Sequence, residues 1–318
     1  MRFVIAIIAM LTGSVAAIAQ QGMPSSEEIQ KRLNAMPPEK RAKLLEDFQR
    51  IMDQQDLFSD LQSGKCARSA EVQIKAGQGD PDSVYMLSEM YRMGWCVAQN
   101  VSLFHDNLEK AAKLGKTSAA FDIGHYYETG TEGYPKAADL AVQWYQTAIA
   151  AGEARAMVSL GSLLLGGKEV PKNTKSALQL LSRAADMDEE NLDASNRALG
   201  QLAIYYMRGE DAPQNFKVSR TYSLRGAAQC DAASMALVAL SFENQNPPDF
   251  GRAYAWASAA TQHSDGKALE FANRVKDQLA QKIDANARSA AELLARKLPI
   301  CLPLEARKRS TSNEPKGR

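Results

Sequence analysis

The sequence predicts an all-α fold in which helix pairs stack in a row. Alanine dominates the composition, and alternating runs rich in Val and Thr are absent, which favours helices over sheets. A pattern of small, apolar and aromatic positions that ends in glycine recurs five times, each time followed by a second helical run. A lone helix pair cannot bury its apolar faces, so the copies are expected to stack on one another.

The clearest copy lies in residues 111–152. Apolar spacing predicts one helix over Ser118–Thr129, closed by Gly130, and a second over Pro135–Ala151, closed by Gly152. Small residues occur where the two helices would cross, and larger ones would fill the space beside the crossing.

The other copies keep the same register. Their first positions lie 36, 37, 42 and 35 residues apart, and their last positions keep these intervals. Asparagine tolerates the left-handed conformation at a helix end, so we expect Asn244 to replace glycine in the fifth copy. The copies begin at Ser83, Ala119, Ala156, Ala198 and Ala233, and they end at Gly94, Gly130, Gly167, Gly209 and Asn244.

These copies resemble the Sel1-like repeats, which are relatives of the tetratricopeptide repeat. The resemblance rests on A-x-x-x-L-G-x-x-Y-x-x-G followed by a K-A-x-x-W-Y-x-x-A type of second helix. It is best in Ala119–Gly152 and partial elsewhere over residues 65–264, where Ser88, Ala203 and Val238 replace the inner glycine. The resemblance implies a right-handed α-solenoid of about five antiparallel helix-pair repeats, with first helices lining a concave face. It also implies a non-enzymatic scaffold or regulator, and exported bacterial members include periplasmic regulators.

Four further segments flank the repeats. Residues 1–19 are expected to be a signal peptide and residues 20–64 an N-terminal helical segment. Residues 265–304 are expected to form a C-terminal helical cap, because an array of repeats needs terminal helices with a polar outer face. Residues 305–318 are expected to be a disordered basic tail.

The first segment has the features of an export signal. Arg2 precedes the apolar run Phe3–Leu11, and Ala17-Ile18-Ala19 offers a small-x-small cleavage site. The run is shorter than the ~20 residues of a membrane-spanning helix, although an uncleaved anchor is the alternative. We expect cleavage near Ala19 and a periplasmic or secreted product. Without Arg2, 37 basic residues balance 37 acidic ones, so the charge favours neither nucleic acid nor an anionic membrane as partner.

Four cysteines in an exported chain suggest two disulfides. Three pairings exist, and we favour Cys66–Cys96 and Cys230–Cys301 because neighbours in a stacked array are also near in sequence. Free buried thiols are the alternative. A metal site is less favoured, because no cysteine pair has zinc-knuckle spacing.

The sequence offers no catalytic, cofactor-binding or metal-binding motif. His105, His125 and His263 lack a second ligand at helical spacing. The run that ends at Gly167-Lys168 lacks the first glycine of a phosphate loop, and Glu169 replaces its Ser or Thr. Acidic pairs fall at helix starts and turns, where acids offset the helix dipole.

The remaining candidate is a surface on the first helices. Counted from the first small residue of each copy, positions 0, +4, +5 and +8 form the core, whereas +2, +6 and +9 share another face. In the related tetratricopeptide arrangement this face lines the groove. It is polar and aromatic in the first two copies and apolar in the last three, which suits a protein segment as ligand. The predicted groove residues are Tyr85, Glu89, Arg92, Phe121, His125, Glu128, Val158, Ser162, Leu165, Gly200, Ile204, Met207, Met235, Ala239 and Phe242.

The sequence therefore favours an exported scaffold or regulator that binds another protein or peptide without a cofactor. One alternative is a cell-envelope enzyme that acts on glycan with dispersed carboxylates, since glycoside cleavage needs two acids across a cleft. Another is a purely structural envelope component. A further alternative is that residues 25–58 or the C-terminal cap already fill the groove.

Overall fold

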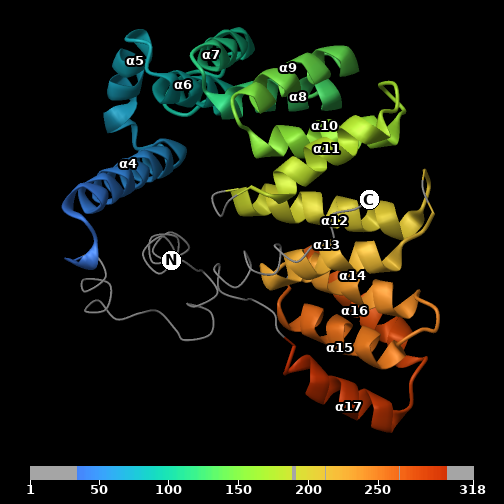
Figure 1. The fold of residues 1–318 in the computed structure, drawn as a ribbon. Coiled ribbons are helices and arrows are strands. Elements are labelled where there is room, and N and C mark those ends of the chain that lie inside the picture. Colours follow the sequence, from blue (N-terminus) through green and yellow to red (C-terminus); the bar gives the residue numbers. More distant parts are fainter. Residues whose placement is uncertain (1–33, 188–190, 212, 265, 299–318) are drawn as a thin grey trace. The chain divides into compact units, whose positions relative to one another are not determined.

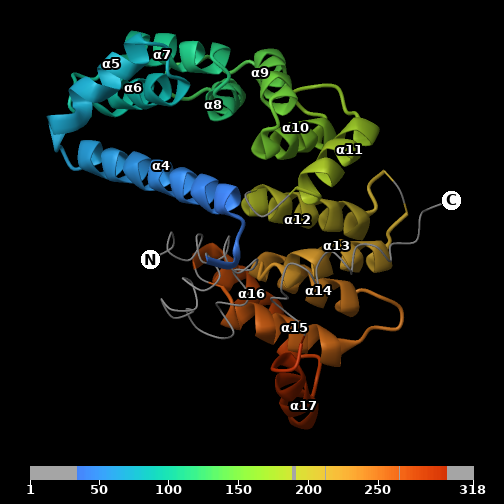
Figure 2. The same ribbon diagram turned by 60° about the vertical axis from the view of Figure 1, so that its left-hand side comes forward.

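The computed structural model describes residues 34–187, 191–211, 213–264 and 266–298, and these residues form helices joined by short connections (Figures 1 and 2). No strand occurs within those ranges, which confirms the prediction of an all-α fold. The predicted signal peptide, residues 20–33 and the predicted tail lie outside the described residues.

Each of the five copies is one pair of helices (Figure 1). The first helices are α6 (Pro81–Met93), α8 (Thr117–Thr129), α10 (Ala154–Gly166), α12 (Leu192–Arg208) and α14 (Ala232–Glu243). The second helices are α7 (Val101–Lys113), α9 (Ala138–Ala150), α11 (Thr174–Ala185), α13 (Phe216–Ala228) and α15 (Phe250–Gln262). The pairs are preceded by α4 (Pro38–Gln62), the 3₁₀ turn η1 (Cys66–Arg68) and α5 (Ser69–Gly77), and they are followed by α16 (Gly266–Ala280) and α17 (Ala285–Ala295).

The chain divides within α11 into two compact units. Residues 38–180 form the N-terminal unit, and residues 181–298 are the body of the C-terminal unit. In the N-terminal unit each helix from α5 to α10 packs on the next. In the C-terminal unit α12 to α15 pack in the same way, α16 packs on both α14 and α15, and α17 packs on α15. Each unit has its own buried apolar core.

One backbone hydrogen bond recurs in every pair. The residue that caps the second helix donates its N–H to a carbonyl near the end of the first helix. In four pairs the acceptor is position +8: Asn100 to Tyr91 (3.0 Å), Ala137 to Tyr127 (2.8 Å), Asn173 to Leu164 (3.0 Å) and Asn215 to Tyr206 (2.8 Å). In the fifth pair Asp249 donates to Phe242, which is position +9, at 3.0 Å.

The same fifth pair corrects one expectation. Gly94, Gly130, Gly167 and Gly209 end their helices with φ between 62° and 73°, in the left-handed region. Asn244 instead has φ −95°, and its side-chain amide donates to the Leu240 carbonyl at 2.8 Å. The expectation of a left-handed asparagine was therefore wrong. The physical reason is the shorter connection: Asp249 follows Asn244 by five positions, whereas Asn100 follows Gly94 by six.

The close helix crossing predicted in residues 111–152 is present, and a second one occurs between α13 and α14. A Cβ on Gly124 of α8 would lie 2.8 Å from Cδ1 of Tyr145 on α9. A Cβ on Gly226 of α13 would lie 2.1 Å from Oγ of Ser234 on α14. Both glycines are therefore needed for the approach of two helices, one inside a pair and one between pairs.

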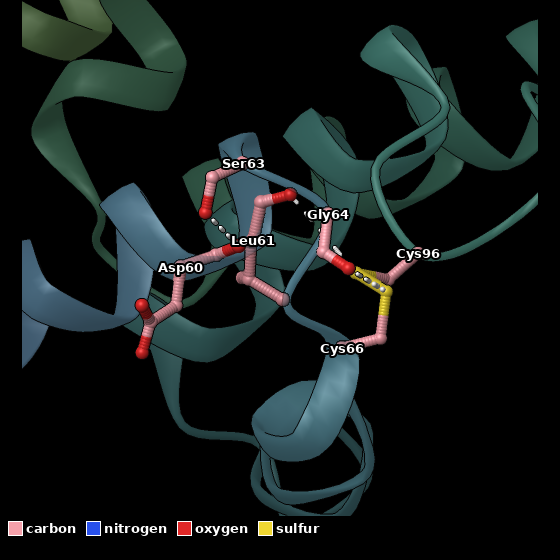
Figure 3. The surroundings of a disulfide bond; sticks show 6 residues. All are labelled: Asp60, Leu61, Ser63, Gly64, Cys66 and Cys96. Atoms are coloured by element: carbon pink, nitrogen blue, oxygen red, sulfur yellow. Dashed lines mark hydrogen bonds between the residues drawn. A yellow bond between two sulfur atoms is a disulfide. The ribbon is translucent and has the colours of Figure 1, made fainter.

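The Cys66–Cys96 disulfide predicted from the sequence is present in the N-terminal unit (Figure 3). It joins η1 to the residues after α6. On the same connection, the Trp95 ring lies edge-on to Phe58 of α4, with centroids 5.0 Å apart. The disulfide thus holds the segment before the first copy against that copy. Of the second predicted pair, Cys301 lies outside the described residues, so Cys230–Cys301 stays a prediction.

Removing the Cys66–Cys96 bond should destabilise the protein. It closes a loop with a sequence separation of 30, and in the loop-entropy model its loss from a Cys66→Ser, Cys96→Ser double variant costs about 3.5 kcal/mol of unfolding free energy. Urea unfolding of both proteins without reductant measures the difference. A difference below about 1 kcal/mol would contradict the assigned role. A further loss when reductant is added to the variant would reveal the second predicted bond.

Gly124→Ala should destabilise the protein by about 1–3 kcal/mol, because the added methyl group meets the ring of Tyr145, which is fully buried. Thermal and urea unfolding measure the effect. The control is Gly77→Ala at the end of α5, where a Cβ would meet no atom within 4 Å. That substitution should leave stability unchanged or raise it by up to about 1 kcal/mol. Equal effects of the two variants would show that the crossing at Gly124 is not tight.

Candidate protein-binding surface

In the N-terminal unit the predicted surface positions of α6 and α8 are tied together. The hydroxyl of Tyr85 on α6 donates to Oδ2 of Asp122 on α8 at 2.8 Å. Burial raises the pKa of the Asp122 carboxyl above its usual value; the Tyr85 hydrogen bond and the charge of Arg155 oppose this shift, and the charge of Glu89 adds to it. A carboxylate is therefore held partly desolvated between two neighbouring copies.

Glu89 and Arg92 form a closed ion pair one turn further along α6. Arg92 donates to Glu89 through Nη2 at 2.7 Å and through Nε at 3.1 Å, and its Nη1 donates to Glu132 at 3.1 Å. Glu89 is only 8% exposed. The hydrogen bonds to Glu89 raise the pKa of the Arg92 guanidinium above its ordinary value. The ion pair and the Arg92–Glu132 contact brace α6 against the connection after α8.

Phe121 is the centre of an ordered aromatic and cationic group. The Arg155 guanidinium lies 4.2 Å from the Phe121 ring centroid, within cation–π range. The His125 ring lies nearly parallel to Phe121, with centroids 6.2 Å apart, and the His125 side chain is half exposed. Nε of Arg155 donates to Glu153 at 2.8 Å, so the guanidinium is held in place. The Arg155 guanidinium and the Phe121 ring are thus ordered before any partner binds.

The other predicted residues of this unit differ in accessibility. Glu128 accepts a short hydrogen bond from the Tyr145 hydroxyl and is thereby tied to α9. Val158 is 1% exposed and belongs to the interior. Ser162 donates to the Val158 carbonyl at 2.8 Å, and Leu165 is partly exposed. Leu165 is therefore the accessible apolar residue among the predicted positions of α10.

In the C-terminal unit the predicted positions separate by helix. Ile204 on α12 is 36% exposed, and Gly200 and Met207 are partly exposed. On α14, by contrast, Met235 and Ala239 are fully buried and Phe242 is 9% exposed. The reason is that α16 packs on α14 and contributes Ala272, Val275 and Leu279 to the same core. The side chains of Val158, Met235, Ala239 and Phe242 are therefore left out of the surface proposed below.

Reasoning from the sequence missed Asp122 and Arg155, which the structure places beside Tyr85 and Phe121. Asp122 stands at +3 of its copy and Arg155 one residue before the third copy, so neither falls in the +2, +6, +9 pattern. Their contacts cross between copies, and an intrahelical periodicity cannot show them. The available signal is spacing: Asp122 follows Tyr85 by 37 residues, one more than the 36 residues between the starts of their copies.

Two further observations concern the described residues as a whole. No three His, Cys, Asp or Glu side chains converge there as they would on a metal ion. None of the described helices is long and apolar enough to cross a membrane.

Comparison with known proteins agrees with this architecture. The Sel1 repeat matches five segments that together make up more than half of the chain: residues 81–116, 117–153, 154–189, 196–229 and 232–265. The chain belongs to the Sel1 repeat family. Its five matched segments begin within a few residues of α6, α8, α10, α12 and α14.

Three known proteins are similar to this chain to different degrees. The chain is 29% identical over 175 residues to an uncharacterized protein of Neisseria meningitidis serogroup B; the match covers 55% of this chain and 34% of that protein. The chain thus spans about a third of that relative. A Sel1 repeat protein from Oxalobacter formigenes is 24% identical, with a TM-score of 0.59 over 78% of this chain and 99% of that one, which shows the shared fold. A protective antigen present in uropathogenic Escherichia coli strains, with an SLR fold, is 16% identical, with a TM-score of 0.41 over 98% and 81% of the two chains.

The effect of Asp122→Asn on the unfolding free energy should become more favourable as pH rises. The pKa of Asp122 is raised in the folded state, so its contribution to stability is complete below the unfolded pKa and is lost as pH rises through the folded pKa. Asparagine keeps an oxygen acceptor for Tyr85 but does not ionise. The unfolding free energy of the variant minus that of the wild type should therefore increase between about pH 3.5 and pH 7.

Glu153→Gln is the matched control, with the opposite sign. Burial would raise the pKa of Glu153, but hydrogen bonds and charge from Arg155 outweigh burial and lower it. The contribution of Glu153 to the unfolding free energy is present above its pKa in the unfolded state. It is lost as pH falls through its pKa in the folded state. Glutamine should therefore cost more at neutral pH than in acid. Urea unfolding at several pH values measures both variants, and the same trend for both would refute this account of the charges.

Proposed function

We propose that this protein is an exported, non-enzymatic scaffold or regulator that binds a segment of another polypeptide. The binding surface lies on α6, α8 and α10 of the N-terminal unit. A second contact region is formed by Ile204 and Met207 on α12 of the C-terminal unit. Sel1 repeats generally mediate protein interactions, and the chain belongs to that family.

The observation that carries the proposal is the group around Phe121. Aromatic residues and arginine dominate the binding energy of protein interfaces, especially where they are rigid before binding. Phe121 is contacted by Arg155, Arg155 is fixed by Glu153, and His125 is stacked beside the ring and half exposed. Leu165 adds an accessible apolar side chain on the next first helix. The surface thus offers anchors that lose little side-chain freedom on binding.

Export has separate support. Phe3–Leu11 and the small residues before Gln20 have the pattern of a cleaved signal. The Cys66–Cys96 disulfide fits an oxidising compartment, where such bonds persist. The two features together support a periplasmic or secreted location.

Single substitutions on the surface should weaken partner binding. Leu165→Asp and Ile204→Asp, made separately, place a charge where the partner would bury an apolar group, and each should reduce cross-linked partner by at least about fivefold. Cross-linking in the intact envelope, followed by mass spectrometry, quantifies the same adduct for each variant. The control is Leu103→Asp on α7, because Leu103 is 37% exposed and Ile204 is 36% exposed. Unchanged recovery with correctly folded variants, or an equal loss with Leu103→Asp, would remove this surface as the binding site.

One observation favours a second candidate, an envelope enzyme that acts on glycan. Glu89 and Asp122 lie on the same surface, and the charge of Glu89 helps to raise the pKa of Asp122, as in paired acids that divide general acid and base roles. Glu89, however, is nearly buried and is occupied by Arg92. We therefore expect no release of soluble sugar from purified cell wall. Release that disappears in Asp122→Asn would establish the enzyme instead.

A further inference from the structure

Arg220 near the start of α13 makes three hydrogen bonds, all to uncharged acceptors. Its Nε donates to the Ser241 hydroxyl at 2.9 Å, and its Nη2 donates to the Ser241 carbonyl at 3.1 Å and to Gln245 at 2.6 Å. No carboxylate of the described residues lies within ion-pair distance of Arg220. A guanidinium carries five N–H donors, so the two on Nη1 remain for another acceptor.

The surroundings of Arg220 favour an anion. Its guanidinium lies 3.8 Å from the centroid of Phe242, and the guanidinium of Arg252 lies 5.8 Å from the same centroid. Burial lowers the pKa of Arg220, and the charge of Arg252 lowers it further, whereas Asp249 acts in the opposite direction. Two cations are thus held near one ring, one of them partly desolvated, and the Asp249 carboxylate acts on both.

That carboxylate is already engaged. Asp249 caps α15 by accepting the backbone N–H of Arg252 at 2.9 Å, and its second oxygen lies 3.5 Å from Nη1 of Arg252. The Arg252 side chain is still 63% exposed. The pair of arginines therefore has an excess of one positive charge and an accessible member.

We propose that Arg220 and Arg252 form a carboxylate-binding site that takes an acidic side chain of the bound polypeptide. Arg220 is fixed in advance by Ser241 and Gln245, and the exposed guanidinium of Arg252 offers a second donor group near the same ring. Guanidinium–carboxylate hydrogen bonds are stronger than neutral ones, and they are strengthened where water is partly excluded. This inference deepens the proposed function and rests on it for the nature of the ligand.

A peptide carboxylate fits this site better than a nucleic acid. The chain has a formal net charge of only +1, whereas phosphate backbones are bound by many lysines and arginines together. Ile204 and Met207 are at least partly exposed on α12. This helix is the first helix of the preceding pair, and it packs on α14, which carries Phe242. An acidic residue next to apolar ones would therefore meet both kinds of contact in the same unit.

Binding of a defined probe to the full mature protein tests the proposal. The probe is an acetylated and amidated peptide of glycine and serine with two central glutamates, and its twin carries glutamines instead. At low salt the glutamate peptide should shift the Nε–Hε resonances of Arg220 and Arg252 and should bind about fivefold more tightly than the glutamine peptide. Equal binding of the two peptides, or shifts at other arginines only, would overturn the proposal. Inorganic phosphate that competes as well as the glutamate peptide would also overturn it, since the site would then be a general anion site.

Variants separate the site from general charge effects. Arg252→Gln should remove the preference for glutamate, and because Arg252 is largely exposed the fold should be retained. Arg208→Gln is the matched control: Arg208 is 67% exposed and pairs with Glu210 at 3.5 Å, outside the site. It should leave the preference intact, and an equal loss in both variants would contradict the assignment. The two proposals can fail separately. If the glutamate peptide binds at Arg220 but partner cross-linking is unchanged in Leu165→Asp and Ile204→Asp, the carboxylate site is retained and the proposed function is rejected.

Discussion

The fold depends on one backbone hydrogen bond that fixes how each second helix leaves its partner. The amide that begins the second helix is satisfied by a carbonyl of the helix before it, so neither group needs water at the turn. Four of these turns also place an Asn or Asp side chain on the amide three residues later, at Asn100, Asn173, Asn215 and Asp249. The direction of each second helix is thereby constrained by contacts within its own copy. Close crossings at Gly124 and Gly226 are consistent with helices brought back at a fixed angle.

Much of this architecture could be predicted because each copy contains its own helix-ending and helix-crossing residues. The glycine at each first-helix end and the small residue at each crossing are local requirements of conformation and space, and both can be read from spacing. The fifth copy shows the limit of that method. Asn244 matched the pattern by residue type, but the following connection is one residue shorter, and the bond to the first helix moves from position +8 to Phe242 at +9.

The candidate surface was predictable only in part, for a different physical reason. Tyr85 and Phe121 were found from the face they occupy on their own helices. Their partners Asp122 and Arg155 belong to neighbouring copies, so they depend on how successive helices are offset. The burial of Met235 and Ala239 depends on α16, which comes later in the chain and lies outside the repeats. A one-helix periodicity contains neither piece of information. As a result, the two units offer different chemistry: a network of acids, aromatics and arginine in one, and two guanidiniums above a buried ring in the other.

The packing of α16 on α14 also gives the array a definite last member. Tandem helical repeats have an edge that resembles the face each copy offers its neighbour, and such an edge invites addition of a further identical hairpin. Here α16, a helix of different sequence, packs on that edge. Lys282, in the connection that follows α16, forms an ion pair with Glu243 of α14 at 2.5 Å. A further identical hairpin would therefore have to displace α16 before it could pack on α14.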